Sequence, residues 1–376
     1  MSGTGYLTYR NVTRRRVDHV FTHFLKPEFP MSSDPSKNPG WQSPLDPRDS
    51  LPPIEPPSMK FIVQLFVIPG VIVAAIVLVW LVIDRLTAAG NNPRDYVAAL
   101  KRNSETRWQA SINLASAMNG TRNTEIRSDP NFAKELSQLL SDELIVETEN
   151  NESITLREYL CKTLGEFWVD EPLPALVKAA GLQRNNAEIP VRRAAIQSLG
   201  LLAENVRTHQ QHELKHPDLI PTLLAVSNLE SNILRSEGAY ALALVGGDEA
   251  ITRLEAMVHD PYPDARYNAS AGLARHGNDQ GRDVLLEMLN PAEHAGIDLE
   301  LEKGLKEHKQ ILMIDAALRS VTFLLEKNPQ LDIAPYLATQ DKLLATLNGR
   351  PKDEVKHIFA QLRERSEKGK SLGDKP

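Results

Sequence analysis

The chain has 376 residues, of which 41% are hydrophobic and 24% are charged, the proportions of an ordinary folded protein. The net charge of −6 is unevenly distributed, because residues 87–376 contain 34 Lys and Arg against 42 Asp and Glu. An acidic surface is a poor match for a phosphate backbone, so the composition argues against a nucleic-acid partner. The single cysteine, Cys161, excludes an internal disulfide.

Residues 1–60 predict a disordered, proline-rich tail. Ten of the 25 prolines lie in residues 27–60, and such a stretch favours extended conformations over a packed core. Met31 opens a segment with the texture of an ordinary soluble N-terminus, whereas residues 1–30 are aromatic and basic. We therefore hypothesise that translation starts at Met31.

Residues 61–86 predict a single transmembrane helix. The stretch 61–83 contains no charged residue, and a helix of 23 residues covers roughly 35 Å, enough to cross a bilayer core of ~30 Å. A cleaved signal peptide is a poorer interpretation, because the apolar run is too long and lacks a small-residue cleavage site. A lipid bilayer is thus the expected partner of residues 61–83.

The charges that flank the span predict its orientation. Arg48 and Lys60 precede it, whereas four basic residues follow it within twenty residues: Arg85, Arg94, Lys101 and Arg102. The positive-inside rule then places the N-terminus outside and the C-terminal part in the cytoplasm. Arg14, Arg15 and Arg16 argue the other way, but they lie far from the span.

Beyond residue 90 the sequence predicts stacked helical hairpins. Five times an arginine is followed seven residues later by a leucine, in a helix rich in small residues. The pairs are Arg107 and Leu114, Arg157 and Leu164, Arg192 and Leu199, Arg235 and Leu242, and Arg266 and Leu273. A recurrence at this period is typical of a repeat array. We expect each arginine to open the second helix of a pair, with the leucine on its core face.

The first helices of the pairs are expected at residues 132–144, 173–180, 219–229, 250–258 and 284–289. Residues 291–303 read as an insertion, and residues 299–326 as one long helix. Two further helices in 331–365 would cap an array that spans 92–365. The remaining residues, 366–376, are expected to be a disordered tail.

The repeats resemble HEAT repeats. In that family an Asp-Pro turn precedes a second helix of the pattern Val-Arg-x-x-Ala-Ala-x-x-Leu-Gly. The chain has similar segments at 191–200, which reads VRRAAIQSLG, and at 259–273, which begins HDPYPDAR. The resemblance covers residues 92–290 and is closest at 188–277. It implies an all-α solenoid and binding to other proteins.

Two interpretations of the recurring arginine remain at this stage. Five cations in register could bind an acidic partner. The resemblance instead implies that each arginine bridges to carboxylates or turn carbonyls of the adjacent repeat, which suits the planar fork of guanidinium. We favour the structural interpretation.

The search for catalytic or metal-binding residues gives no candidate, and no cofactor is expected. His209, His212 and His216 cluster, but a fourth zinc ligand is missing and the segment is polar. Deoxyhypusine hydroxylases are similar HEAT-like enzymes that carry several His-Glu pairs, whereas this chain has only His212–Glu213. A HEAT-like enzyme, similar to phycobilin lyases or dependent on a metal, stays as the alternative function.

The sequence therefore predicts a membrane-anchored HEAT-like scaffold that binds proteins and does no catalysis. The contact residues are expected at the second and fifth positions after each arginine, which lie opposite the core. They are Tyr159, Lys162, Gln197, Glu237, Tyr240 and Asn268. Tyrosine is enriched at the centres of interfaces, so Tyr159 and Tyr240 come first.

Overall fold

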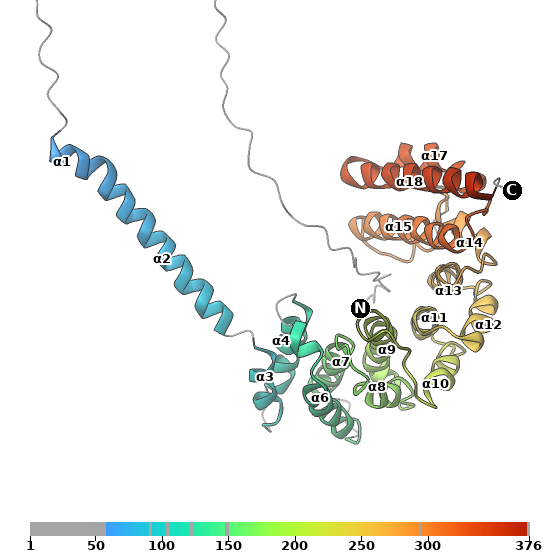
Figure 1. Ribbon diagram of the computed structural model, residues 1–376. Coiled ribbons are helices and arrows are strands. Elements are labelled where there is room, and N and C mark those ends of the chain that lie inside the picture. The colour runs from blue at the N-terminus through green and yellow to red at the C-terminus, as the bar shows by residue number, and fades with distance from the viewer. Residues whose placement is uncertain are drawn as a thin grey trace, which may run out of the picture. The chain divides into compact units, whose positions relative to one another are not determined.

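The computed structural model describes residues 58–89, 92–102, 106–120, 124–146, 150–293 and 295–373. The expected N-terminal tail, apart from residues 58–60, and the hypothesis about Met31 lie outside these residues. The described residues form helices and their connections, with no strand among them. They divide into two units, a long apolar helix and a helical array (Figure 1).

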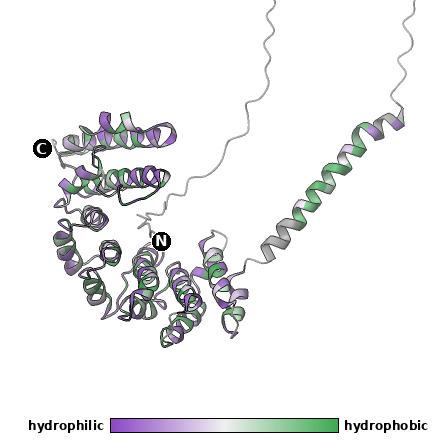
Figure 2. Ribbon diagram, turned by 180° about the vertical axis from the view of Figure 1, so that it is seen from behind, coloured by the Kyte–Doolittle hydropathy of each residue, from purple (hydrophilic) through white to green (hydrophobic). Residues whose placement is uncertain are grey.

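The long helix joins α1 (Met59–Ile62), a π-helical turn (Val63–Val67) and α2 (Ile68–Ala89). Pro69 has no N–H to donate to the carbonyl of Leu65, and the π-helical turn directly precedes this gap in the hydrogen-bond ladder. The stretch Val63–Val82 has a mean hydropathy of 3.0, and none of it is buried in the structure. Green, the colour of hydrophobic residues, predominates along this helix in Figure 2. Its length and composition are those of a helix able to cross a membrane.

The array consists of helices that pack in pairs. The first helices of the pairs are α3 (Pro93–Leu100), α6 (Pro130–Glu143), α8 (Leu173–Ala180), α10 (Leu219–Val226), α12 (Asp248–Met257) and α14 (Arg282–Met288). The second helices are α4 (Arg107–Asn119), α7 (Asn151–Leu164), α9 (Ile189–Gln210), α11 (Asn232–Val245), α13 (Pro263–Arg275) and α15 (Lys303–Lys327). Short helical turns, α5 (Thr124–Arg127) and a 3-10 turn (Asn186–Glu188), lie in the connections.

The second helices form a continuous layer, because α11 packs against both α9 and α13, and α7 packs against both α4 and α9. Figure 1 shows α9, α11 and α13 on the inner side of the arc that the array describes, and α10 and α12 on its outer side. We call the exposed face of the second helices the inner surface. The arrangement is that of an α-solenoid.

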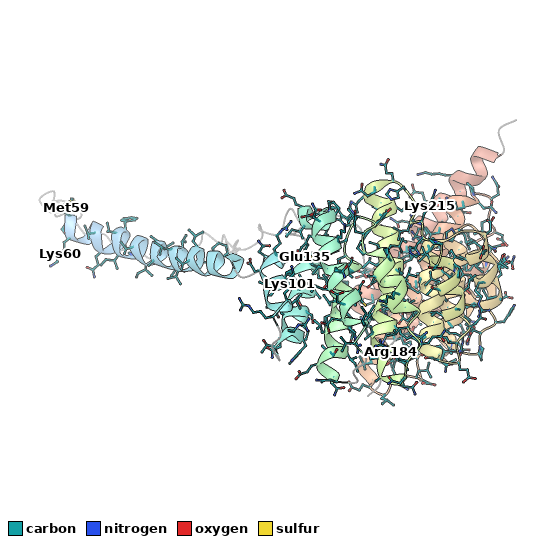
Figure 3. All side chains as sticks on the ribbon, turned by 90° about the horizontal axis from the view of Figure 1, so that it is seen from below. Met59, Lys60, Lys101, Glu135, Arg184 and Lys215 are labelled. Atoms are coloured by element: carbon teal, nitrogen blue, oxygen red, sulfur yellow. The ribbon has the colours of Figure 1, made fainter. Side chains whose placement is uncertain are left out.

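The helices run between two edges of the array. Connections within a pair, such as 181–188, lie at one edge, which we call the turn edge. Connections from one pair to the next, such as 211–218, lie at the opposite edge. Figure 3 labels one residue of each, Arg184 and Lys215, and places them on opposite sides.

The repeated leucines form the core of the second-helix layer. All five have no exposed surface: Leu114, Leu164, Leu199, Leu242 and Leu273. The expected first helices agree with α6, α8, α10, α12 and α14 within three residues at each end. Arg157 departs from the expectation, since it lies in the middle of α7 rather than at its start. The side chain of Asn150, seven residues before Arg157, caps that helix by accepting the N–H of Glu152.

The C-terminal end differs from the prediction. Residues 331–365 were expected to hold two helices, but α16 (Ala334–Leu337), α17 (Gln340–Thr346) and α18 (Gly349–Gly373) follow α15. The expected tail boundary at 366 is wrong, because α18 continues to Gly373. The buried residues Leu362, Ser366 and Gly369 extend its apolar stripe at intervals of three and four. Gln330 also donates to the carbonyl of Gly369 at 3.0 Å, which fixes the last turns.

Close approach of the second helices depends on small residues. A Cβ at Gly272 of α13 would lie 2.5 Å from the Cβ of Ala243 in α11, and a Cβ at Gly200 of α9 would lie 3.3 Å from the Cα of Ala241. These contacts leave no room for a larger side chain. Glycine here permits the spacing of the layer, at a cost in helix propensity.

Gly272→Ala tests this spacing. The added methyl must push α11 and α13 apart, and overpacking of this kind costs about 1–3 kcal/mol. The matched control is Gly304→Ala in the first turn of α15, where a Cβ meets nothing within 4 Å, and where alanine should add about 0.5–1 kcal/mol of stability. Urea unfolding of the full chain in detergent, followed by circular dichroism, measures both. Equal stability of the two variants would contradict the close-packing argument.

Candidate protein-binding surface

The five repeated arginines bind backbone carbonyls at the end of the first helix of their own pair or in the turn that follows it. The acceptors are Leu100 for Arg107 (2.6 Å), Val146 for Arg157 (3.2 Å), Ala180 for Arg192 (3.3 Å), Leu229 for Arg235 (3.0 Å) and Pro261 for Arg266 (3.4 Å). Carbonyls at a helix C-terminus lack intrahelical donors and carry partial negative charge. Each arginine therefore closes its own hairpin.

Four of the five arginines also pair with a carboxylate of the next repeat. Arg235 forms a bidentate pair with Asp260, at 2.8 and 3.0 Å. The other pairs are Arg107 with Glu143 (2.5 Å), Arg157 with Glu188 (2.9 Å) and Arg266 with Glu287 (3.1 Å from Nε to Oε2). These contacts agree with the interpretation that each arginine connects adjacent repeats, rather than with binding of an acidic partner. One guanidinium thus joins two successive pairs of helices.

Arg192 is the exception, because it forms no ion pair within the described residues of the array. Helix α10, the first helix of the next pair, reads LIPTLLAV and offers no carboxylate. Burial lowers the pKa of Arg192, with no charged group opposing the effect. In contrast, the hydrogen bond to Asp260 raises the pKa of Arg235 in spite of burial. The repeated arginine therefore forms no ionic link between the central pairs α8–α9 and α10–α11.

The predicted contact residues divide into two groups. Tyr159, Lys162, Gln197 and Tyr240 are half-buried on the second helices, and the ammonium of Lys162 lies 4.3 Å from the ring centre of Tyr159. Glu237 and Asn268 are buried, with 5% and 8% exposure. The prediction that these two residues contact a partner is therefore wrong, and they are not part of the candidate surface.

Glu237 and Asn268 are buried because neighbouring repeats take up their polar atoms. Arg193 and Gln197 of α9 each donate to one carboxylate oxygen of Glu237 at 2.8 Å. The amide of Asn268 donates to the backbone carbonyl of Ser236 at 3.0 Å. Burial raises the pKa of Glu237, against the opposing effect of Arg193. The two residues thus join α9 to α11 and α11 to α13.

A second buried ionic group continues this line toward α15. The ammonium of Lys309 lies 3.1 Å from Asp264 of α13 and 3.2 Å from Glu300 of the α14–α15 connection. The hydroxyl of Tyr262 donates to Asp264 at 3.3 Å. Burial raises the pKa values of Asp264 and Tyr262. Near the turn edge, the second helices from α9 to α15 are therefore linked by charged and polar side chains.

A further ionic link lies toward the other edge of the array. Arg275 at the end of α13 reaches past α11 and donates to Glu204 of α9 at 2.5 Å. Arg207 of α9 also pairs with Glu204, and the guanidinium of Arg275 lies 5.7 Å from the ring centre of Phe323 in α15. Two lines of polar contacts therefore connect α9 to α15. Tyr240 belongs to α11, the helix between these partners, and its ring would be 3.4 Å from a Cβ at Gly200.

The histidine segment is tied to the preceding connection. The ring of His209 stacks on Trp168 at 3.6 Å between centroids, and His212 Nε2 lies 3.0 Å from both carboxylate oxygens of Asp170. His216 accepts the N–H of Asp218 at 3.2 Å. Within the described residues, no group of three His, Cys, Asp or Glu side chains is placed to hold a metal ion. His209 and His212 thus connect Trp168 and Asp170 to the end of α9 and the residues that follow it.

A pocket of about 470 Å³ opens beside this segment, and sequence reasoning missed it. It lies between the 213–220 segment and the glycine turn Gly246–Gly247. Both glycines have positive φ, 76° and 93°, which the sharp turn between α11 and α12 requires. The walls mix apolar side chains such as Leu214 and Ile220 with Lys215 and His216. No sequence motif marks it, because its walls come from two connections thirty residues apart.

The comparison with protein families matches the central part of the array. Residues 189–274 match the family model of HEAT repeats, and this range runs from the start of α9 to the end of α13. A comparison with curated proteins found no match. The family match supports a HEAT-repeat protein and a helical repeat scaffold that can mediate protein interactions.

The arginine contacts predict a difference between two variants. Arg235→Gln removes a bidentate pair and two carbonyl contacts, at 2.9 and 3.0 Å, and leaves the carboxylate of Asp260 buried; it should cost about 2–3 kcal/mol of stability. Arg192→Gln removes one hydrogen bond and should cost under about 1 kcal/mol. Chemical unfolding of the full chain in detergent measures both. If the two variants lost the same stability, the ion pair with Asp260 would not be the cause of the larger loss expected for Arg235→Gln.

Proposed function

We propose that this protein is a membrane-anchored HEAT-type scaffold that binds a protein partner on its inner surface and does no catalysis. The observation that carries the proposal is the layer of second helices. It exposes half-buried Tyr159, Lys162, Gln197 and Tyr240 along successive repeats, while the repeated arginines are committed to contacts within the array. Extended inner surfaces of this kind are the binding sites of solenoid proteins.

Rigidity of this surface supports binding. The polar links from α9 to α15, through Glu237, Lys309 and Arg275, hold neighbouring second helices in register. A preorganised surface loses less conformational entropy when a partner binds. Tyr159 and Tyr240 supply large, amphipathic contact area with only two side-chain torsions each. We therefore propose these two tyrosines as the main contact residues of the inner surface.

The anchor that we propose is the apolar helix around Val63–Val82. Its length, its mean hydropathy of 3.0 and its lack of buried surface support insertion into a bilayer. The excess of basic residues after the span supports an array on the cytoplasmic side and an N-terminus outside.

Truncation of the two tyrosines tests the binding surface. Tyr159→Ala with Tyr240→Ala should lower the yield of cross-linked partner peptides at least tenfold in native membranes, because interface tyrosines contribute about 1–2 kcal/mol each. Lys178→Ala, at an exposed position on the outer helix α8, is the control and should change nothing. Cross-linking with mass spectrometry provides the measurement and names the partner. An unchanged pattern in the tyrosine variant would overturn the inner surface as the binding site.

Fractionation tests the anchor and its orientation. The full chain should remain in the membrane pellet at alkaline pH, and removal of residues 63–82 should release it. In sealed vesicles with the cytoplasmic side inside, a protease added outside should spare the array and degrade it only after detergent is added. Release of the intact chain at alkaline pH would contradict the anchor. Degradation of the array without detergent would contradict the orientation.

A further inference from the structure

The connection between α14 and α15 contains a short segment, residues 299–301, in which the usual burial of polar and apolar side chains is reversed. Glu300 is buried with 6% exposure, whereas its apolar neighbours Leu299 and Leu301 are exposed at 47% and 81%. Folded proteins usually bury leucine and expose glutamate. Both departures cost free energy, and departures from local rules of this kind concentrate at functional sites.

The buried glutamate fixes the connection to the array. Its carboxylate lies 3.2 Å from the ammonium of Lys309, which also contacts Asp264 at 3.1 Å. A buried charge requires such a partner, so Glu300 is held inward by electrostatics rather than by shape. With Glu300 turned inward, Leu299 and Leu301 point outward.

The base of the connection is also packed closely. Ile297 is buried with 5% exposure, and a Cβ at Gly296 would lie 2.8 Å from the ring of Tyr267. Only a glycine permits the backbone to cross the tyrosine ring this closely. The connection is thus a fixed platform that displays two leucines, and we call residues 297–302 the leucine platform.

Exposed apolar side chains of this size are rare in the rest of the array. Within its described residues, the large hydrophobic side chains with high exposure are Ile145, Val146, Leu299 and Leu301. Ile145 and Val146 follow the end of α6, and Arg157 and Arg184 each donate to the carbonyl of Val146 at 3.2 Å. Leu299 and Leu301 combine exposure with a backbone held by the buried Glu300, which is a condition for an interface anchor.

The charge around the leucines indicates the chemistry of the partner. Glu293, Asp298, Glu302 and Glu307 outnumber the lysines around the platform, Lys303 and Lys306, and Lys306 lies 2.9 Å from Asp298. Acidic side chains repel anionic lipid headgroups and favour a partner that carries lysine or arginine. A protein surface is therefore favoured over a bilayer.

We propose that Leu299 and Leu301 insert into a hydrophobic cleft of a protein partner whose rim carries basic residues, with Glu300 as the latch that presents them. The inference rests on the proposed function as a scaffold, but it concerns a connection at the turn edge rather than the inner surface. It deepens that function by naming a second contact and the chemistry of the partner's surface.

The test replaces the leucines in the full chain in native membranes. A photo-reactive amino acid in place of Lys303, which is exposed beside the platform, reports what lies against the platform in every variant. Leu299→Ser with Leu301→Ser should lower the cross-linking yield to the partner at least tenfold, with the unfolding midpoint unchanged because both side chains are exposed. Ile145→Ser with Val146→Ser, which removes the other exposed apolar pair, should leave the yield unchanged. Mass spectrometry should place the cross-link in a partner segment that lines an apolar cleft with flanking Lys or Arg.

A variant of Glu300 tests whether this residue holds the two leucines in position, separately from their own contact with the partner. Glu300→Ala keeps both leucines but releases the connection, and it should lower the same yield severalfold. Equal yield in Glu300→Ala and the wild type would overturn the role of the latch. Equal yield in the leucine variant, or cross-links to lipid or to a second copy of the chain, would overturn the inference. If only the tyrosine variant lost the partner, the proposed function would stand and the inference about the leucine platform would fail. If neither the tyrosine variant nor the leucine variant changed the cross-links, the proposed function would fail as well.

Discussion

The array depends on one interaction, the double use of an arginine on the second helix of each pair. Its guanidinium donates to a carbonyl at the end of the preceding helix or in the turn after it and, in four of five repeats, to a carboxylate of the next pair. The same group therefore closes a hairpin and fixes its neighbour. Because these arginines are used within the array, binding to a partner must rely on other side chains. This constraint is why the proposed surface consists of half-buried tyrosine, lysine and glutamine.

Much of the fold could be predicted because the signals are local. Period-seven spacing of arginine and leucine, small residues between them, and the apolar run at 61–83 are each contained in one helix. The buried leucines and the HEAT-repeat match at 189–274 agree with that pattern. The end of α18 was missed because Ser366 and Gly369 do not look like core residues. Gly369 is buried because α18 packs along the turn at Pro329 and Gln330.

The binding surface was less predictable, since helical periodicity gives the direction of a side chain but not what covers it. Glu237 and Asn268 occupy the same positions as Tyr159, two residues after the repeated arginine, yet they are buried by partners 40 and 32 residues away. The link between Glu204 and Arg275 spans 71 residues, past an entire repeat. Contacts at such distances leave no mark in a single sequence. The orientation of the span and the identity of the contact residues stay predictions.

The link between Glu204 and Arg275 also bears on how the array responds to load. Most contacts in a solenoid join neighbours, so a solenoid flexes like a chain of hinges. A tie from α9 to α13 crosses two such hinges on the inside of the curve. Opening the arc at its middle would stretch this tie, whereas closing it would not. The central repeats should therefore behave as a stiff segment between two more compliant arms.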